Sequence, residues 1–151
     1  MRWMLMALAV VAAPVAAQET REGWVVIETA RDFDTLVERV RDAVAEAPIA
    51  VVTQASASDG AAMQGARIPG NRVLGLFRND YARRMLEASV AAGIEAPIRM
   101  YVTEAADGTA TLSWKEPSFV FAPYMDEGGE ALADLAAELD GVFAEIGEAA
   151  R

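Results

Sequence analysis

Hydrophobic positions along the chain fall into short runs, typical of strands, and into longer stripes with helical spacing. The runs at Gly23–Thr29, Ile49–Gln54 and Arg72–Phe77 are rich in β-branched and aromatic residues, and each predicts a β-strand. Two further strands follow Pro97, which cannot continue a helix and has no N–H to donate, so it suits the first position of a strand. The glycine-rich residues 55–71 predict mostly loop, with room for one helical turn.

Three segments carry apolar residues at helical spacing. The first has Asp32 as a natural N-cap and ends at Pro48, while the second is capped by Asn79 or Asp80 and runs to about Ala91. The third closes the chain and has the clearest stripe. The residues predicted to face inward are Phe33, Leu36, Val37, Val40 and Val44 in the first helix, Met85 and Leu86 in the second, and Leu132, Leu135, Leu139, Val142, Phe143 and Ile146 in the third.

The register of the two strands after Pro97 decides which of their residues share a face. A two-residue turn would mix apolar and polar residues on both faces. A three-residue connection at 106–108 instead pairs Met100 with Trp114 and Val102 with Leu112, which keeps the apolar set together. We therefore expect this longer loop, with its glycine at positive φ as a G1 bulge. The opposite face then carries Arg99, Tyr101, Ser113 and Lys115, and is polar and cationic.

The predicted order of elements is β-α-β-β-α-β-β-α. Adjacent strands and a hairpin favour a mainly antiparallel sheet with helices packed on one face, which is an α+β fold. Residues 18–151 contain no internal repeat and no low-complexity linker, so they predict a single domain.

The first residues have the pattern of a cleavable export signal. One arginine precedes an apolar run that is shorter than the roughly 20 residues a membrane span needs. Val15 and Ala17 then occupy the −3 and −1 positions of a signal-peptidase site. We predict that residues 1–17 form a signal peptide cut between Ala17 and Gln18, which gives a periplasmic or secreted protein. A permanent N-terminal anchor is the alternative.

Charge and composition exclude several classes of function. The 151 residues include 13 basic and 23 acidic side chains, for a net charge of −10, so nucleic acids and anionic membrane surfaces are not expected as partners. The chain has no cysteine and no histidine, which removes thiol nucleophiles, imidazole bases and Cys/His zinc sites. Methionines 63, 85, 100 and 125 lack the close spacing of a copper site. No metal and no cofactor is predicted.

One long segment resembles a known family. The stretch VLGLFRNDYARRMLEASVAAGIEAPIRMYVTEAADGTATLSWKEPSFVFAPY (Val73–Tyr124) is similar to the family catalogued as domain of unknown function 302, and a weaker likeness covers most of residues 24–148. The positions that carry the resemblance are Gly75, Phe77, Asn79, Pro97, Arg99, Asp107, Gly108, Trp114 and Pro117. It implies a compact α+β domain, often exported, with a homodimer as one option, and it brings no established reaction or cofactor. Some relatives carry a histidine near the end of the second strand, where this chain has TQASAS.

The polar face of the hairpin is the best candidate site. Arg99 and Lys115 are expected to be cross-strand neighbours, although like charges in that arrangement destabilise a sheet. Acids such as Glu104 and Glu116, or solvent, offer one explanation. The other is that the two cations bind a small anionic ligand or the carboxylates of a protein partner. The ligand-binding residues predicted on this basis are Arg99, Tyr101, Ser113, Lys115, Arg78 and Tyr124, and no catalytic residue is predicted.

An enzyme is the alternative to a binding module. It would be hydrolase- or isomerase-like and would use carboxylate, tyrosine or arginine chemistry in a pocket between residues 55–71 and the segment SFVFAPY at 118–124. The absence of histidine, cysteine and a nucleophile motif favours the non-enzymatic module. Arg78, Arg83 and Arg84 lie around the start of the second predicted helix, where pairing with local acids is the expected role.

Overall fold

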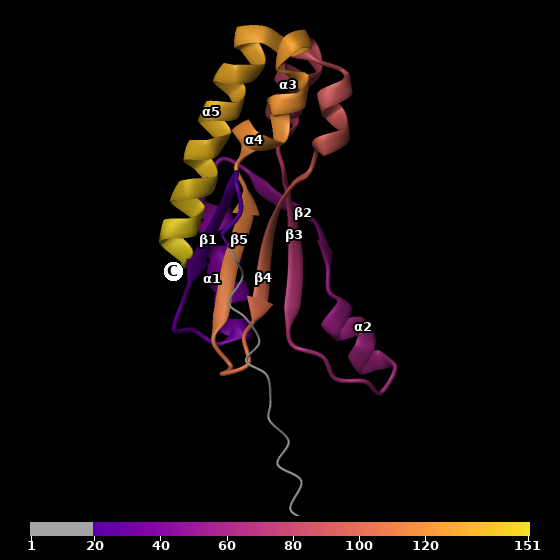
Figure 1. Ribbon diagram of the computed structural model, residues 1–151, viewed down its shortest axis with the longest axis vertical. Coiled ribbons are helices and arrows are strands. Elements are labelled where there is room, and N and C mark those ends of the chain that lie inside the picture. Colours follow the sequence, from indigo (N-terminus) through magenta and orange to yellow (C-terminus); the bar gives the residue numbers. More distant parts are fainter. Residues whose placement is uncertain (1–19) are drawn as a thin grey trace, which may run out of the picture.

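A five-stranded antiparallel sheet in the order β1-β5-β4-β3-β2 forms the centre of the computed structural model, which describes residues 20–151 (Figure 1). The predicted signal peptide, residues 1–17, lies outside the described residues. The strands are β1 (Trp24–Glu28), β2 (Ala50–Ala55), β3 (Asn71–Phe77), β4 (Ile98–Glu104) and β5 (Ala110–Lys115). The helices are α1 (Phe33–Glu46), α2 (Ala57–Met63), α3 (Asn79–Ala88), α4 (Pro117–Phe121) and α5 (Met125–Ala150), with 3-10 turns η1 (Ala91–Glu95) and η2 (Ala122–Tyr124).

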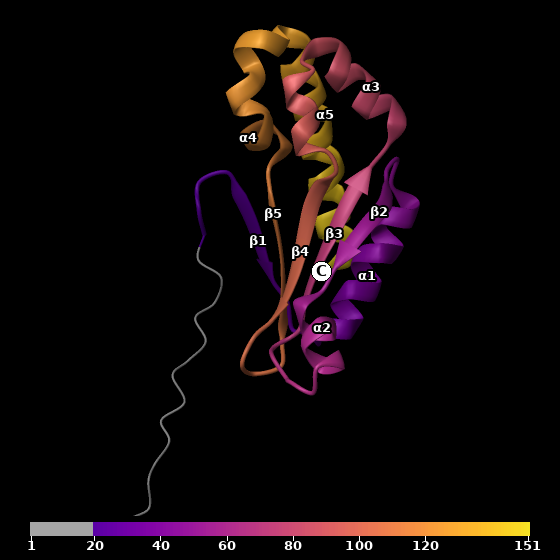
Figure 2. The same ribbon diagram turned by 90° about the vertical axis from the view of Figure 1, so that its right-hand side faces the viewer.

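Helices α1 and α5 pack on the same face of the sheet, and the core lies between them and the strands (Figures 1 and 2). The fully buried Leu74, Met100 and Leu112 come from three neighbouring strands, while α1 and α5 supply residues such as Leu36 and Phe143. Burying each large apolar side chain contributes roughly 1.5–3 kcal/mol, which explains why the amphipathic helices lie on this face. The α+β class predicted from the sequence is confirmed.

The hairpin of β4 and β5 has the predicted register. Met100 pairs with Trp114 and Val102 pairs with Leu112. The loop is the three-residue one, closed by a hydrogen bond from the Ala105 amide to the Thr109 carbonyl at 2.8 Å. Gly108, with φ of +85°, takes the left-handed position that a G1 bulge needs.

Residues 55–71 contain more helix than the sequence suggested. Helix α2 spans Ala57–Met63, and the hydroxyl of Ser56 caps it by accepting a hydrogen bond from the Asp59 amide at 3.0 Å. The expectation of mostly loop was wrong, because the sequence Ser-Ala-Ser-Asp supplies a cap that outweighs the glycines nearby.

Helix α3 also differs from its prediction. It begins at Asn79, so neither Asn79 nor Asp80 is its cap, and Asp80 instead forms an ion pair with Arg78 at 2.5 Å. It ends at Ala88 rather than near Ala91, because the chain turns into η1, where the Ser89 hydroxyl accepts a hydrogen bond from the Ala92 amide at 3.2 Å. Met85 is buried as predicted, but Leu86 is 46% exposed and was wrongly placed in the core.

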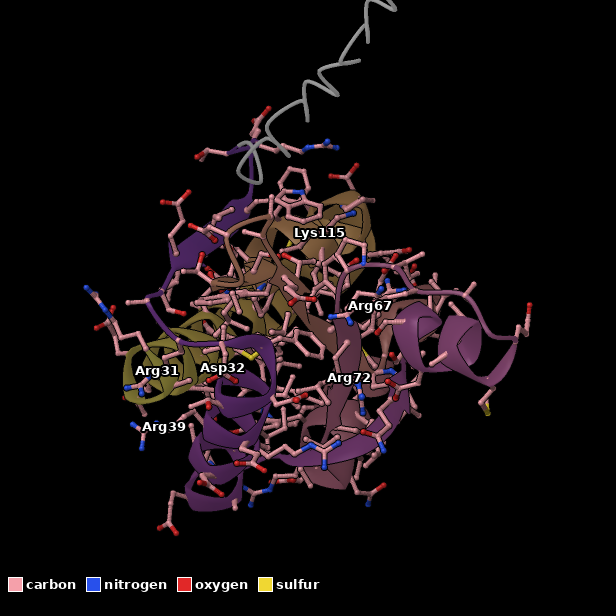
Figure 3. All side chains as sticks on the ribbon, turned by 90° about the horizontal axis from the view of Figure 1, so that it is seen from below. Arg31, Asp32, Arg39, Arg67, Arg72 and Lys115 are labelled. Carbon is pink, nitrogen blue, oxygen red and sulfur yellow. The ribbon has the colours of Figure 1, made fainter. Side chains whose placement is uncertain are left out.

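The closing helix keeps its predicted apolar stripe but starts earlier than the glycine pair. Gly129, with φ of 55° and ψ of −150°, interrupts the helical conformation inside α5. Two arginines lie beside the C-terminal end of α5, Arg31 just before α1 and Arg39 within it (Figure 3). Arg31 donates to the carbonyl of Arg151, the residue that follows α5, at 2.9 Å. Arg39 donates to the Ala149 carbonyl at 2.7 Å, which places a positive charge at the negative end of the helix dipole, where it is stabilising.

None of the helices in the described part of the chain is long and apolar enough to cross a membrane.

Candidate functional site

The sheet face opposite α1 and α5, which we call the open face, carries the polar residues predicted for the hairpin. Tyr101 is paired with Ser113 on β5 and with Val73 on β3, and Lys115 is paired with Trp24 on β1. Because side chains in one cross-strand row point the same way, these residues share a face. Figure 3 shows Lys115 on the side of the sheet away from α1. The structure therefore brings together four of the six predicted site residues.

A groove of about 330 Å³ lies on the open face near the end of the sheet that α4 covers. We call it the open-face groove. Its lining residues are Trp24, Val73, Glu95, Ile98, Arg99, Tyr101, Ser113, Trp114, Lys115 and Val120. The lining residues that the sequence did not predict for the site are Trp24, Val73, Glu95, Ile98, Trp114 and Val120. Alternation along β1 would have placed Trp24 on the open face, but nothing local to Glu95 or Val120 indicates that η1 and α4 come to the rim.

The two cations of the groove are not neutralised by ion pairs. Among residues 20–151, neither Arg99 nor Lys115 has a carboxylate within 4.0 Å. Glu104, one of the acids expected to neutralise them, instead accepts a hydrogen bond from the Gly70 amide at 2.6 Å. Lys115 lies over the ring of Trp24, with Nζ 5.7 Å from the ring centroid. Continuing the β4–β5 register places Arg99 directly opposite Lys115.

Tyr124 reaches the groove through Glu95. The Tyr124 hydroxyl donates a hydrogen bond of 2.8 Å to Oε1 of Glu95, a lining residue. This hydrogen bond, together with desolvation and the charge of Glu95, raises the pKa of Tyr124. The Tyr124 phenol therefore keeps its proton at neutral pH and donates a hydrogen bond to Glu95, the one carboxylate among the described residues that line the groove.

Arg78 is separated from the other predicted site residues. Its side chain pairs with Asp80, donates to the Pro48 carbonyl at 3.1 Å and lies over the Tyr81 ring at 5.4 Å. It lines a separate, largely apolar pocket near the core. Nearby, Arg83 pairs with the local acid Glu87 at 2.8 Å, as expected. Arg84 instead pairs with Glu138 of α5 at 2.7 Å, so its partner is not local.

The pocket predicted for the enzyme alternative is not formed. Residues 55–71, which contain α2, lie at one end of the sheet, and α4 with η2 lies at the other (Figure 1). Within residues 20–151, no group of three or more Asp or Glu side chains comes together where it could hold a metal ion. The open-face groove thus offers cations, hydroxyl groups and rings, with one carboxylate at its rim.

A second groove of about 290 Å³ adjoins the first. It shares Val73, Glu95 and Arg99 with the open-face groove and continues toward β2 along Thr53, Ala55 and Ile94, among other residues. Arg99 therefore borders both hollows of the open face.

Comparisons with known proteins agree with this architecture. A family model described as "Domain of unknown function DUF302" matches residues 25–146. Among solved structures, the chain is similar to an uncharacterized conserved protein DUF302 from Bacillus stearothermophilus, with 17% sequence identity and a TM-score of 0.75 over 87% of this chain and 100% of that one. At this identity the likeness shows the fold alone. No curated protein matches the sequence. Since the family model spans most of its length, the chain belongs to the DUF302 family.

Proposed function

We propose that this protein is a non-enzymatic binding module whose open-face groove holds a small anionic ligand. The observation that carries the proposal is the pair of cations without ion pairs, Arg99 and Lys115, in a chain whose net charge is −10. Two like charges in cross-strand positions destabilise the free sheet, and a bound anion would offset that repulsion. The hydroxyl group of Tyr101 lies in the next cross-strand row and adds a hydrogen-bond donor.

The single carboxylate at the rim is a reason to prefer binding over catalysis. Enzymes that use carboxylates as both general acid and general base pair two titratable groups whose environments set their pKa values apart. Here Glu95 is engaged by Tyr124, and the raised pKa of Tyr124 keeps its phenol protonated at neutral pH, so it is not available as a general base. We therefore assign Glu95 and Tyr124 to shaping the rim.

Titration calorimetry with a panel of small carboxylates and inorganic phosphate tests the proposal. Arg99→Gln and Lys115→Gln should each weaken binding about tenfold, because a hydrogen bond to a charged group contributes roughly 1.5–3 kcal/mol. Arg83→Gln is the matched control, since Arg83 is an exposed arginine paired with Glu87 away from the groove. Absence of heat with every anion, or equal affinities for all three variants, would contradict the proposal.

We also propose that the module acts in the periplasm or outside the cell, after cleavage following Ala17. The composition of residues 1–17 supports this placement. Native mass spectrometry of the protein purified from its own host tests it: we expect a chain that begins at Gln18. The same spectrum reports any retained ligand and the number of subunits. A dimer without a ligand would favour a second copy of the chain as the partner of the open face.

A further inference from the structure

The lining of the open-face groove is amphipathic. Arg99 and Lys115 provide positive charge, while Trp24, Val73 and Val120 provide apolar surface in the same hollow. An inorganic ion bound by the two cations would leave these apolar side chains in contact with water. An organic ligand with an apolar body would cover them, and each methylene buried would add to its affinity.

The size of the groove points the same way. Its volume of about 330 Å³ is at the lower end of the range of roughly 300–1,000 Å³ that holds small organic molecules. An acetate or phosphate ion fills a small part of such a space. The second groove, beyond Val73, gives a longer apolar body room to continue.

We infer that the ligand is an amphipathic organic anion, with an acidic headgroup between Arg99 and Lys115 and a hydrocarbon body against Trp24 and Val73. This inference rests on the proposed function and names the class of ligand that the groove takes. Glu95, whose Oε1 is held by the Tyr124 hydroxyl, repels a negative headgroup from the rim. The headgroup is therefore directed to the cations, and the rim is left to uncharged parts of the ligand.

A homologous series of straight-chain acids tests the inference. Acetate, butanoate, hexanoate and octanoate are titrated into the mature protein, and binding is followed by calorimetry and by intrinsic fluorescence, to which Trp24 and the buried Trp114 both contribute. We expect the affinity to rise about threefold to fourfold for each methylene that enters the groove. 1-Hexanol, the neutral match of hexanoate, should bind at least about tenfold more weakly because it lacks the charge.

Two variants separate the headgroup from the body of the ligand. Lys115→Gln should lower the affinity for all four acids by the same factor, about tenfold. Val73→Thr keeps a β-branched residue in the strand and should reduce the gain per methylene. Arg83→Gln should change neither quantity, and circular dichroism confirms that all variants are folded.

Each outcome decides a different claim. Equal affinities for acetate and octanoate would overturn the inference and leave the proposed anion binding standing. Hexanol binding as tightly as hexanoate would overturn the anionic headgroup. Binding of none of the acids would remove both the inference and the proposed function.

Discussion

A β-carbon on Gly75 would lie 2.9 Å from Cγ of Pro97, the residue two positions before its cross-strand partner Arg99. The same carbon would lie 2.2 Å from the hydroxyl oxygen of Thr53 on β2. Gly75 is paired with Arg99, so this close approach sets the position of the strand that carries one of the two groove cations. The junction at Pro97 thus depends on a residue without a side chain beneath it.

Gly75→Ala is expected to destabilise the protein by roughly 1–3 kcal/mol, since the added methyl must displace the proline ring or the Thr53 side chain. Urea denaturation measures the change in the free energy of unfolding. Gly141→Ala is the control, because no neighbouring atom lies within 4 Å of its β-carbon position and alanine is the better helix former. That variant should be more stable by about 1 kcal/mol. A Gly75→Ala protein as stable as the wild type would contradict the close packing.

Leu135→Ala should destabilise the protein by about 2–5 kcal/mol, because Leu135 is fully buried in α5 and its truncation leaves a cavity. Leu86→Ala removes the same atoms from a side chain that is 46% exposed. We expect it to cost less than about 1 kcal/mol, measured by the same denaturation experiment. Similar losses for the two variants would mean that Leu86 is buried after all.

These residues illustrate which parts of the fold were predictable. The period-two pattern of β4 and β5 fixed the hairpin register, because only one connection keeps Met100 and Trp114 on the same face. The prediction that Leu86 faces the core was wrong because α3 is shorter than expected and turns into η1. The apolar stripe had been drawn over a longer helix, which placed Leu86 on the buried face. Helix α2 was missed because its glycines carried more weight than the Ser56 cap.

The candidate site was predictable only as far as the hairpin itself extends. Arg99, Tyr101, Ser113 and Lys115 are brought together by local alternation. Trp24 comes from a strand far away in sequence that pairs with β5, and Glu95 and Val120 come from connections whose course depends on tertiary packing. For the same reason the sequence could not show that Arg78 lies apart from the groove, where it contacts Asp80 and Tyr81 beside a different pocket.

Asp32, the cap of α1, should make stability depend on pH in the acidic range. Hydrogen bonds from the amide and hydroxyl of Thr35 lower its pKa below the ordinary value of 3.8. The stabilisation is therefore complete above the unfolded pKa and is lost as pH falls through the folded pKa. Asp32→Asn keeps an acceptor oxygen but does not titrate. Urea denaturation from pH 7 to pH 2 measures the difference in unfolding free energy between the wild type and this variant. We expect the difference to stay constant near neutral pH and to shrink at low pH. A pH-independent difference would contradict the cap.

The hydrogen bond from Tyr124 to Glu95 should make stability depend on pH in the alkaline range, with stability falling as pH rises. The raised pKa of Tyr124 means that the folded protein favours the protonated phenol that donates to Glu95. The stabilisation is complete below the unfolded pKa of about 10 and is lost as pH rises through the folded pKa. Subtracting the phenolate absorbance of Tyr124→Phe from that of the wild type gives the titration of Tyr124 alone. Its pKa should lie above that of free tyrosine. Glu95→Gln keeps the acceptor without the charge and should lower the pKa toward the ordinary value.

Arg99→Gln should stabilise the ligand-free protein while weakening anion binding. Removing one of two opposed cations relieves a repulsion of roughly 0.2–1 kcal/mol. Lys115→Gln relieves the same repulsion but also removes the contact of Lys115 with the Trp24 ring, which contributes about 0.5–1 kcal/mol. The two effects oppose each other, so the net change in stability of this variant should be near zero. Thermal unfolding at low and high salt separates these effects, because added salt screens the repulsion and should narrow the gap between wild type and Arg99→Gln. If Arg99→Gln is instead less stable than the wild type at low salt, the two cations do not repel each other in the free protein, and the main reason for expecting an anion between them is gone.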